Sequence, residues 1–254
     1  LCGIIIIIFM KFDFEKTDSM DIITTTNYYD NSKSSIVMDV TTKRVLYQNN
    51  IHERMLPAST TKILTCITAI EHYQLDDFVV INSEVLKTEG SSIYLEVGDV
   101  ISIKDLLYGL MLCSGNDAAN ALALHYSGNM QDFIFLMNET AKKIGMHNST
   151  FENPHGLDTT TKNYTTTYDM ALLMSYAMKN ETFKDITSTK DYNPTIISGK
   201  KMYYHNKHRL IQNDEKVTGG KTGYTKNAKR TLVTSFKQED FEIVVVTFNC
   251  SDDL

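Results

Sequence analysis

Three short polar motifs, far apart along the chain, contain side chains able to catalyse acyl transfer. The first is Ser59-Thr60-Thr61-Lys62, which opens an apolar-periodic stretch that predicts a helix beginning near Ser59. Because residues three apart share one helix face, the Ser59 hydroxyl can meet the Lys62 amine. A buried lysine near another cation has a lowered pKa and can take the proton of an attacking serine. Alone the motif is weak evidence, since a serine helix cap followed by a surface lysine is commoner.

The second motif, Ser114-Gly115-Asn116, interrupts two helical pieces expected within residues 101–126. A polar loop at such a break presents a hydroxyl and an amide to one cleft. Ser114 could then relay a proton between Lys62 and a leaving amine, while Asn116 orients the substrate and the lysine. The alternative is a plain helix–helix turn with glycine and asparagine as caps. Taken alone, the motif favours that alternative.

The third motif, Lys221-Thr222-Gly223, lies in a glycine-rich stretch, residues 219–224. Glycine in a strand lets a ligand backbone approach closely and pair with it. Lys221 offers a cation for a carboxylate, and Thr222 offers a hydroxyl donor. A phosphate-binding loop ending in Gly-Lys-Thr would need an earlier glycine at the position of Glu215, so that interpretation fails.

The elements that position these motifs follow the order strands, helices, strands. Two short strands around the polar turn at 39–44 predict a hairpin, and β-branched runs at 232–236 and 243–248 predict two late strands. We therefore expect an α+β fold, with an antiparallel sheet built from both chain ends and an inserted helical lobe. The sheet regions are 34–85 and 190–254 of a catalytic domain spanning 34–254, and the helical lobe is 86–189.

Separate predictions concern the two ends of the chain. The first ten residues are almost wholly apolar, too short to span a membrane, and fit the apolar part of a secretory signal whose start is missing. The alternative is a buried N-terminal strand. Together with a polar, flexible lead-in they form the segment 1–33. The chain stops four residues after Cys250, just beyond an expected strand, so we expect the C-terminal end to be incomplete.

Composition excludes several classes of function. With 254 residues, 42% of them hydrophobic, the chain has ample material for a core. A net charge of −6 argues against a nucleic-acid partner, which needs clustered lysine and arginine. The four cysteines match no zinc or redox spacing. His205 and His208 fall in an expected exposed turn, 201–209, so we expect neither a metal site nor a cofactor.

In this order, Ser-x-x-Lys, Ser-x-Asn and Lys-Thr-Gly are the three elements of penicillin-recognising serine enzymes. From about residue 34 to 247 the sequence resembles the D-alanyl-D-alanine carboxypeptidases of the low-molecular-mass penicillin-binding proteins. The resemblance extends beyond the motifs to NPHGLD at 153–158 and YTTTYDMALL at 164–173. It implies a β-lactamase/DD-peptidase-like transpeptidase fold.

The resemblance also implies roles for the motif residues. Ser59 is the acylated nucleophile, Lys62 accepts its proton and Ser114 relays protons. Backbone N–H groups of Ser59 and Tyr224 form the oxyanion hole. The residues implied to bind substrate are Asn116, Lys221, Thr222, Gly223 and Tyr224.

The implied activity is removal of the terminal D-alanine from the peptidoglycan pentapeptide stem, with β-lactam antibiotics as inhibitors. The implied location is extracytoplasmic, secreted or on the outer face of the bacterial membrane, and attachment would need a C-terminal anchor that this chain lacks. A class A β-lactamase is one alternative, but that class has Ser-Asp-Asn as its second element and needs a deacylating glutamate. Glu152 and Glu181 lack the surrounding pattern. A catalytically silent cell-wall-binding protein is the other alternative.

Overall fold

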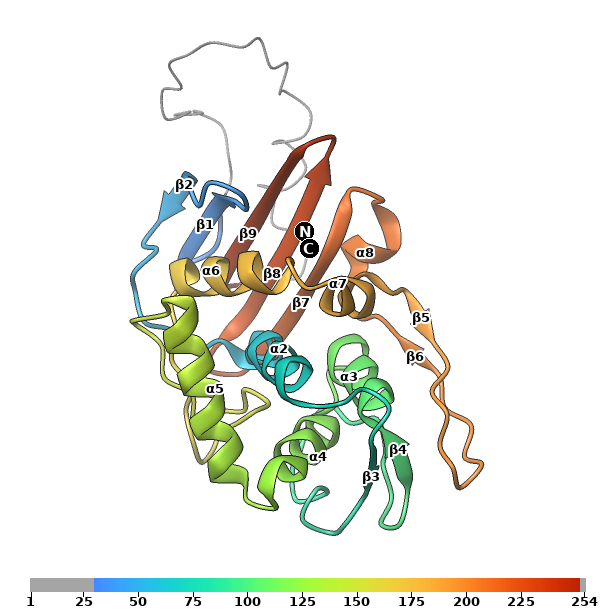
Figure 1. The fold of residues 1–254 in the computed structure, drawn as a ribbon. Coiled ribbons are helices and arrows are strands. Elements are labelled where there is room, and N and C mark those ends of the chain that lie inside the picture. Colours follow the sequence, from blue (N-terminus) through green and yellow to red (C-terminus); the bar gives the residue numbers. More distant parts are fainter. Residues whose placement is uncertain (1–29, 252–254) are drawn as a thin grey trace.

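The computed structural model describes residues 30–251 (Figure 1). The apolar start of the chain, interpreted above as part of a secretory signal, lies outside these residues, as does most of the lead-in. Among the residues described, none of the helices combines the length and the apolar character needed to cross a membrane.

A five-stranded antiparallel sheet in the order β2-β1-β9-β8-β7 forms one layer of the molecule (Figure 1). The early strand β1 pairs with the last strand β9, with Ile36 opposite Val246. The prediction of one sheet built from both chain ends is therefore confirmed. The strands are β1 Ser34–Asp39, β2 Val45–Asn49, β7 Val217–Thr225, β8 Lys229–Gln238 and β9 Phe241–Cys250.

Strand β9 carries an unbroken buried run, Ile243 to Phe248, rather than an apolar–polar alternation. Such a run is expected where both faces of a strand are covered. Val244 and Val246 belong to the main core under the helices, whereas Ile243 and Val245 pack in a smaller cluster on the opposite face. Burial on both sides makes this strand the rigid centre of the sheet.

Most helices cover one face of the sheet and extend into a lobe beside it, whereas the short helix α8 packs with the smaller cluster on the other face (Figure 1). Helix α6 packs on β9 and β1, α7 packs on β7, and α2 lies between these and the outer helices. Polar caps fix the helix starts: the Ser102 hydroxyl accepts from the Asp105 N–H at 3.1 Å, and Thr166 does the same for Asp169 at 3.0 Å. The helices are α2 Lys62–His72, α3 Ile103–Leu112, α4 Asn116–Ser127, α5 Met130–Ile144, α6 Thr167–Ala177, α7 Glu181–Ser188 and α8 Arg209–Asn213.

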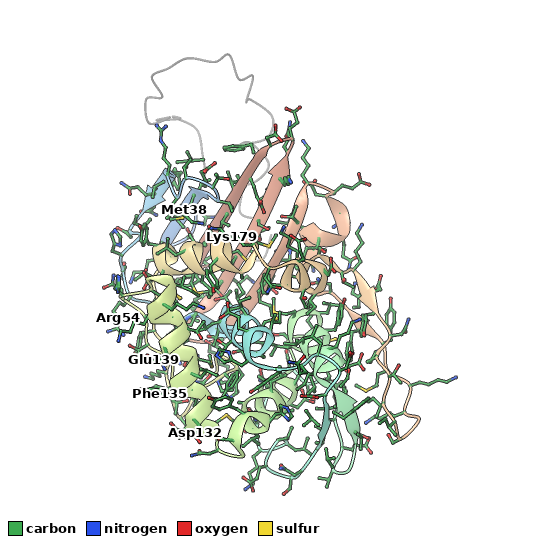
Figure 2. The ribbon with its side chains drawn as sticks, viewed as in Figure 1. Met38, Arg54, Asp132, Phe135, Glu139 and Lys179 are labelled. Carbon is green, nitrogen blue, oxygen red and sulfur yellow. The ribbon has the colours of Figure 1, made fainter. Side chains whose placement is uncertain are left out.

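Helix α5 shows the amphipathic pattern of a lobe helix. Phe133 and Met137 are fully buried, whereas Asp132, Phe135 and Glu139 are exposed along the outer side of the helix (Figure 2). The spacing of three and four residues between like positions is the pattern of an amphipathic helix.

One expectation about the late part of the chain is only partly right. In the segment 201–209, Tyr203, His205 and Lys207 are exposed as expected, but Tyr204, Asn206 and His208 are only 1%, 4% and 2% exposed. Tyr204 lies in β6 Tyr204–His205, which pairs with β5 Asp191–Tyr192. Some of the buried polar groups find partners inside, such as the Asn206 amide, which donates to the Thr189 carbonyl at 2.9 Å. The sequence analysis also did not predict the antiparallel pair of β3 Phe78–Val80 and β4 Val100–Ser102.

Candidate active site

Ser59 lies in a 3₁₀ turn, η1 Ala58–Thr61, that leads directly into α2, so the α-helix itself begins at Lys62 rather than at Ser59. The side chains nevertheless meet as their spacing predicts, with the Lys62 Nζ 3.1 Å from the Ser59 Oγ. Lys62 is completely buried. The pair is thus a hydroxyl in contact with an amine that is shielded from solvent.

The Lys62 amine has two further partners. Its Nζ lies 2.7 Å from the Asn116 Oδ1 and 2.7 Å from the His155 carbonyl oxygen. The Asn116 side-chain amide is itself oriented, because its Nδ2 donates to the Glu89 carbonyl at 2.6 Å. A neutral amine has two N–H groups and one lone pair. With both N–H groups directed at the two carbonyl oxygens, the lone pair faces the Ser59 hydroxyl.

The electrostatics of the site favour that neutral amine. Burial lowers the pKa of Lys62 well below its ordinary value, and the positive charges of Lys221 and Lys207 lower it further, against an opposing contribution from Asp117. Removing an ammonium from water and placing it near two cations destabilises its charged form. Lys62 is therefore better suited than an ordinary lysine to accept a proton.

Ser114 and Asn116 follow the end of α3 at Leu112, and α4 begins at Asn116. Ser114 is 5% exposed and has a φ of 63°. A non-glycine residue in the left-handed region costs of order 1–3 kcal/mol, and such residues gather at functional sites. The structure brings Asn116 into contact with Lys62, whereas the Ser114 hydroxyl forms no hydrogen bond with Lys62 or Lys221 among the described residues.

Strand β7 brings the third motif against η1. Gly223 is required there, because a Cβ at this position would lie 2.8 Å from the Ser59 backbone nitrogen. Lys221 is 2% exposed, and its Nζ lies 2.8 Å from the Thr222 carbonyl oxygen. Burial, and secondarily the charge of Lys207, lower the pKa of Lys221 to about 7. Tyr224 is exposed, with the Arg230 guanidinium 5.2 Å from the centre of its ring.

The loop at 153–158 supplies a backbone group that the sequence analysis missed. It approaches η1 so closely that a Cβ on Gly156, whose φ is +90°, would lie 1.8 Å from the Ala58 carbonyl oxygen. The Asn153 Oδ1 accepts from the Gly156 N–H at 2.7 Å and fixes the turn. These contacts aim the His155 carbonyl at Lys62. Burial lowers the pKa of the His155 imidazole to about 3, so the ring is neutral at neutral pH.

Lys207 and His208 are two further neighbours that sequence reasoning did not assign to the site. Lys207 is exposed, and its Nζ lies 3.4 Å from the Ser91 Oγ. The His208 Nε2 lies 2.7 Å from the Thr234 hydroxyl, behind β7, and burial lowers the pKa of this imidazole to about 3. In residues 30–251 there is no cluster of three or more His, Cys, Asp or Glu side chains fit to hold a metal.

A serine, a buried lysine and an asparagine thus meet beside the glycine-rich edge of an antiparallel sheet that helices cover on one face. This fold and this set of motifs are those of the penicillin-recognising serine enzymes. The chain belongs to the D-alanyl-D-alanine carboxypeptidase family, whose model matches residues 23–252. The resemblance stated from the motifs and the α+β transpeptidase fold are both confirmed.

Two relatives illustrate the similarity in sequence. The chain is 34% identical to the D-alanyl-D-alanine carboxypeptidase DacF of Bacillus subtilis (strain 168) over 256 residues, which cover 99% of this chain and 65% of that protein. It is 34% identical to DacC of Escherichia coli (strain K12), covering 87% of this chain and 57% of that one. The chain thus spans about two thirds or less of the length of these relatives.

Two solved structures illustrate the similarity in fold. A D-alanyl-D-alanine carboxypeptidase from Mycobacterium tuberculosis H37Rv superposes with a TM-score of 0.86 at 27% identity, covering 92% of this chain and 89% of that one. The Streptomyces K15 DD-transpeptidase superposes with a TM-score of 0.84 at 29% identity, covering 90% and 93%. The fold therefore extends over nearly the whole of this chain.

Proposed function

We propose that this protein is a serine-type D-Ala-D-Ala carboxypeptidase that removes the terminal D-alanine from peptidoglycan stem peptides. The observation that carries the proposal is the buried Lys62 amine, which is in contact with Ser59, Asn116 and the His155 carbonyl. Such an amine can activate a serine without a histidine or a metal. Family membership supports the choice of substrate and an extracytoplasmic place of action.

In the acylation step, the Ser59 Oγ attacks the carbonyl carbon of the penultimate D-alanine while Lys62 takes the hydroxyl proton. The oxyanion that forms accepts hydrogen bonds from the backbone N–H groups of Ser59 and Tyr224. The peptide C–N bond then breaks, and the proton reaches the leaving nitrogen through Ser114, so that D-alanine departs as a free amino acid. Water next attacks the ester, with Lys62 again as base, and regenerates Ser59.

Recognition of the substrate depends on its charged end. Lys221, assisted by the Thr222 hydroxyl, binds the terminal carboxylate, while Gly223 leaves room for the peptide backbone along β7. Asn116 orients the peptide from the opposite wall of the site. β-Lactams carry a carboxylate and a reactive carbonyl in comparable positions, so we propose that they acylate Ser59 as inhibitors.

Intact-mass spectrometry of the protein incubated with benzylpenicillin tests this function. Opening of the lactam ring releases no fragment, so the expected adduct adds the whole mass of the drug and maps to the peptide containing Ser59. A long-lived adduct supports the carboxypeptidase. Rapid turnover without accumulation would instead support a β-lactamase, and no reaction at all would support the catalytically silent protein.

The β-lactamase alternative gains no support from the glutamates considered above. Glu152 is exposed, and its Oε2 accepts from the Lys162 N–H at 2.9 Å. Glu181 is 81% exposed at the start of α7 and pairs with Lys184 at 2.7 Å. A carboxylate that activates a deacylating water must be held at the acyl-enzyme, and neither exposed side chain is constrained in this way.

The affinity for a carboxylate-terminated substrate is expected to fall as the pH rises through the pKa of Lys221, about 7. Below this pH Lys221 is a cation and attracts the carboxylate, whereas above it the attraction is lost. We expect KM for diacetyl-Lys-D-Ala-D-Ala to rise roughly tenfold between about pH 6 and pH 9. The matched peptide with a C-terminal amide lacks the charge, so its KM should stay constant. Equal pH dependence for the two peptides would remove Lys221 from carboxylate binding.

A further inference from the structure

The outer edge of β7, beside the candidate active site, is closed by a side chain instead of a strand. β7 is the last strand of the sheet, and α7 packs along it (Figure 1). The Thr187 hydroxyl, in the last turn of α7, accepts the Gly220 N–H at 2.9 Å and donates to the Gly220 carbonyl at 3.1 Å. One buried side chain thus makes both of the hydrogen bonds that a neighbouring strand would make to this residue.

The contact with Thr187 also shows which backbone groups of β7 face away from the sheet. The N–H and C=O of one strand residue point to the same side, and alternate residues share that side. The outward groups are therefore those of Gly220, Thr222 and Tyr224. A peptide that pairs with β7 from Tyr224 back to Thr222 meets the groups already bound to Thr187 at the next position, so the edge open to a peptide ends at Thr222.

Two glycines that the proposed mechanism does not use allow this close approach. A Cβ on Gly219 would lie 2.3 Å from the Thr187 Cγ2, and a Cβ on Gly220 would lie 2.7 Å from the His208 Nε2. The backbone just before Lys221 is therefore in contact with α7 on one side and with a buried imidazole on another. The glycine pair of the third motif is explained by these contacts.

The held backbone leads directly into Lys221, whose Nζ lies 2.8 Å from the Thr222 carbonyl oxygen. Lys221 is 2% exposed, so a carboxylate can reach its ammonium only from a narrow range of positions. Binding groups of this kind must be held to within about half an ångström. Without the Thr187 hydroxyl, the Gly220 N–H and C=O would be buried without partners, and the strand would have to move to pair them.

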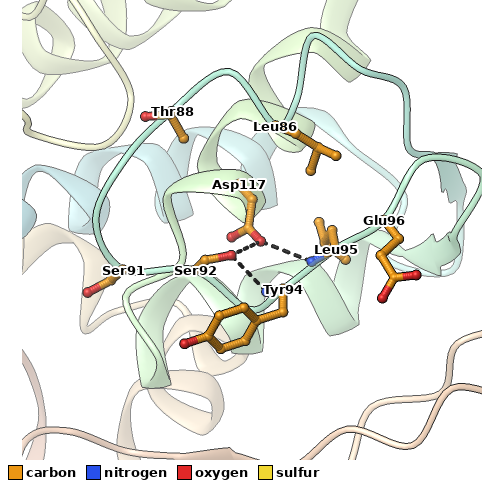
Figure 3. A pocket seen from close by; sticks show the side chains of 8 residues that line it. All are labelled: Leu86, Thr88, Ser91, Ser92, Tyr94, Leu95, Glu96 and Asp117. Atoms are coloured by element: carbon orange, nitrogen blue, oxygen red, sulfur yellow. Dashed lines mark hydrogen bonds between the residues drawn. The ribbon is translucent and has the colours of Figure 1, made fainter.

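The opposite wall of the site is fixed by a carboxylate. Asp117, which follows Asn116 on α4, accepts hydrogen bonds from the Ser92 hydroxyl at 2.6 Å and from the Leu95 N–H at 3.2 Å (Figure 3). These bonds hold the segment 92–95 against the start of α4. With that wall fixed, the distance from Asn116 to the carboxylate-binding group depends on how β7 is held.

We infer that Thr187 is a positioning residue for recognition of the substrate carboxylate: it takes the place of a neighbouring strand at Gly220, and so holds Lys221 at the point where the peptide ends. The inference rests on the proposed function, because that function places the terminal carboxylate at Lys221. Thr187 touches no substrate and acts only through the backbone of β7.

The test measures the preference for a charged peptide end. Diacetyl-Lys-D-Ala-D-Ala and its C-terminal amide are titrated by ligand-observed NMR into the Ser59→Ala chain at about pH 6, where Lys221 is a cation. We expect the acid to bind about tenfold more tightly than the amide. Thr187→Val keeps the shape of the side chain but loses both hydrogen bonds, and should reduce this preference to about twofold or less. Thr187→Ser keeps the hydroxyl, so its preference should stay within about twofold of the parent value.

Thr68 in α2 provides a matched control. It is fully buried, and its hydroxyl has no hydrogen-bond partner within residues 30–251. Thr68→Val should therefore keep the full preference. A merely structural role of Thr187 would lower the affinities for the acid and the amide alike, and would leave their ratio unchanged.

A second pair of variants tests the same contact if Thr187→Val does not fold. In Gly219→Ala the added methyl group would overlap the Thr187 Cγ2 and push that side chain away from β7. We expect the preference to fall to about twofold or less in this variant as well. Adding Thr187→Ser removes the Cγ2 and keeps the hydroxyl, so the double variant should recover to within about twofold of the parent preference.

A folded Thr187→Val chain with the full preference would overturn the inference, as would a loss in Gly219→Ala that Thr187→Ser does not restore. Equal affinities of acid and amide for the Ser59→Ala chain would overturn it as well. Labelling of the unaltered chain by penicillin reports separately on the proposed function. An acylated protein whose preference ignores Thr187 refutes the positioning role alone, whereas failure to acylate refutes the function while the binding ratio still judges Thr187.

Discussion

The Ser59→Ala variant is expected to form no penicillin adduct and to release D-alanine at least about 10⁴-fold more slowly than the unaltered chain. The Ser59 oxygen is the atom to which the Lys62 lone pair is directed, at 3.1 Å. Without it no acyl-enzyme forms, and substrate binding alone leaves only a small residual rate. D-Alanine released from diacetyl-Lys-D-Ala-D-Ala is measured with a coupled D-amino-acid oxidase assay.

An exposed serine outside the site, Ser83, provides the control. Ser83→Ala should keep both the adduct and the full rate. The Ser59→Ala protein should still fold, because the Lys62 amine keeps its Asn116 and His155 partners and loses only one hydrogen bond, a change of about 1 kcal/mol. D-Alanine release at more than a hundredth of the normal rate by a folded Ser59→Ala protein would contradict the nucleophile assignment.

Local spacing made the central contact of the site predictable. Ser59 and Lys62 are three residues apart, and both 3₁₀ and α geometry return side chains at that spacing to one face, so the contact survives although α2 begins later than expected. The β-branched run at 243–248 is long enough to predict the strand β9. The joining of both chain ends in one sheet was predictable, because the early and the late strands both need a partner.

The partners that complete the site were beyond this reasoning, because they act through backbone or through distant packing. The His155 carbonyl is a backbone group, which every residue type has, so the sequence does not mark it. Its orientation towards Lys62 depends on the close approach of Gly156 to Ala58. Lys207 affects the pKa of both buried lysines only because the chain turns back after β6. Strands of two or three residues, such as β5 and β3, are too short to show a period.

The polar segment at 201–209 shows where composition misled. Its sequence is typical of a solvated turn, but alternate side chains are buried and some of their polar groups find partners, including Thr234 for the His208 Nε2. Among the described residues, the Tyr204 hydroxyl and the His208 Nδ1 are buried without a hydrogen-bond partner. For the groups that have a partner the cost of burial is small, since a hydrogen bond to water is exchanged for one inside the protein. Only the tertiary structure reveals those partners, so a sequence pattern cannot distinguish this case from an exposed loop.

Replacing Lys62 by arginine separates the need for a proton acceptor from the need for a positive charge. Arginine stays protonated in proteins, so it offers no lone pair to the Ser59 hydroxyl at any accessible pH. We expect the second-order rate constant of acylation by fluorescent penicillin to fall by about 10²–10⁴-fold, with no recovery up to about pH 10. The Asn116 and His155 carbonyl oxygens can still accept hydrogen bonds from the guanidinium, so we expect the variant to fold. The fall in the acylation rate constant should therefore be larger than a loss of folded protein explains.

Lys221→Arg provides the comparison, because Lys221 is proposed to act as a cation rather than as a base. That variant should retain acylation to within about tenfold, and its affinity for carboxylate-terminated peptides should no longer decline above about pH 7, since the guanidinium does not titrate there. Equal losses in the two variants would mean that crowding by the larger side chain, rather than proton transfer, explains the Lys62 result. Acylation of Lys62→Arg within tenfold of normal would show that another group takes the serine proton. A large loss confined to Lys62→Arg would assign two buried lysines, both with lowered pKa values, to opposite protonation states in one reaction.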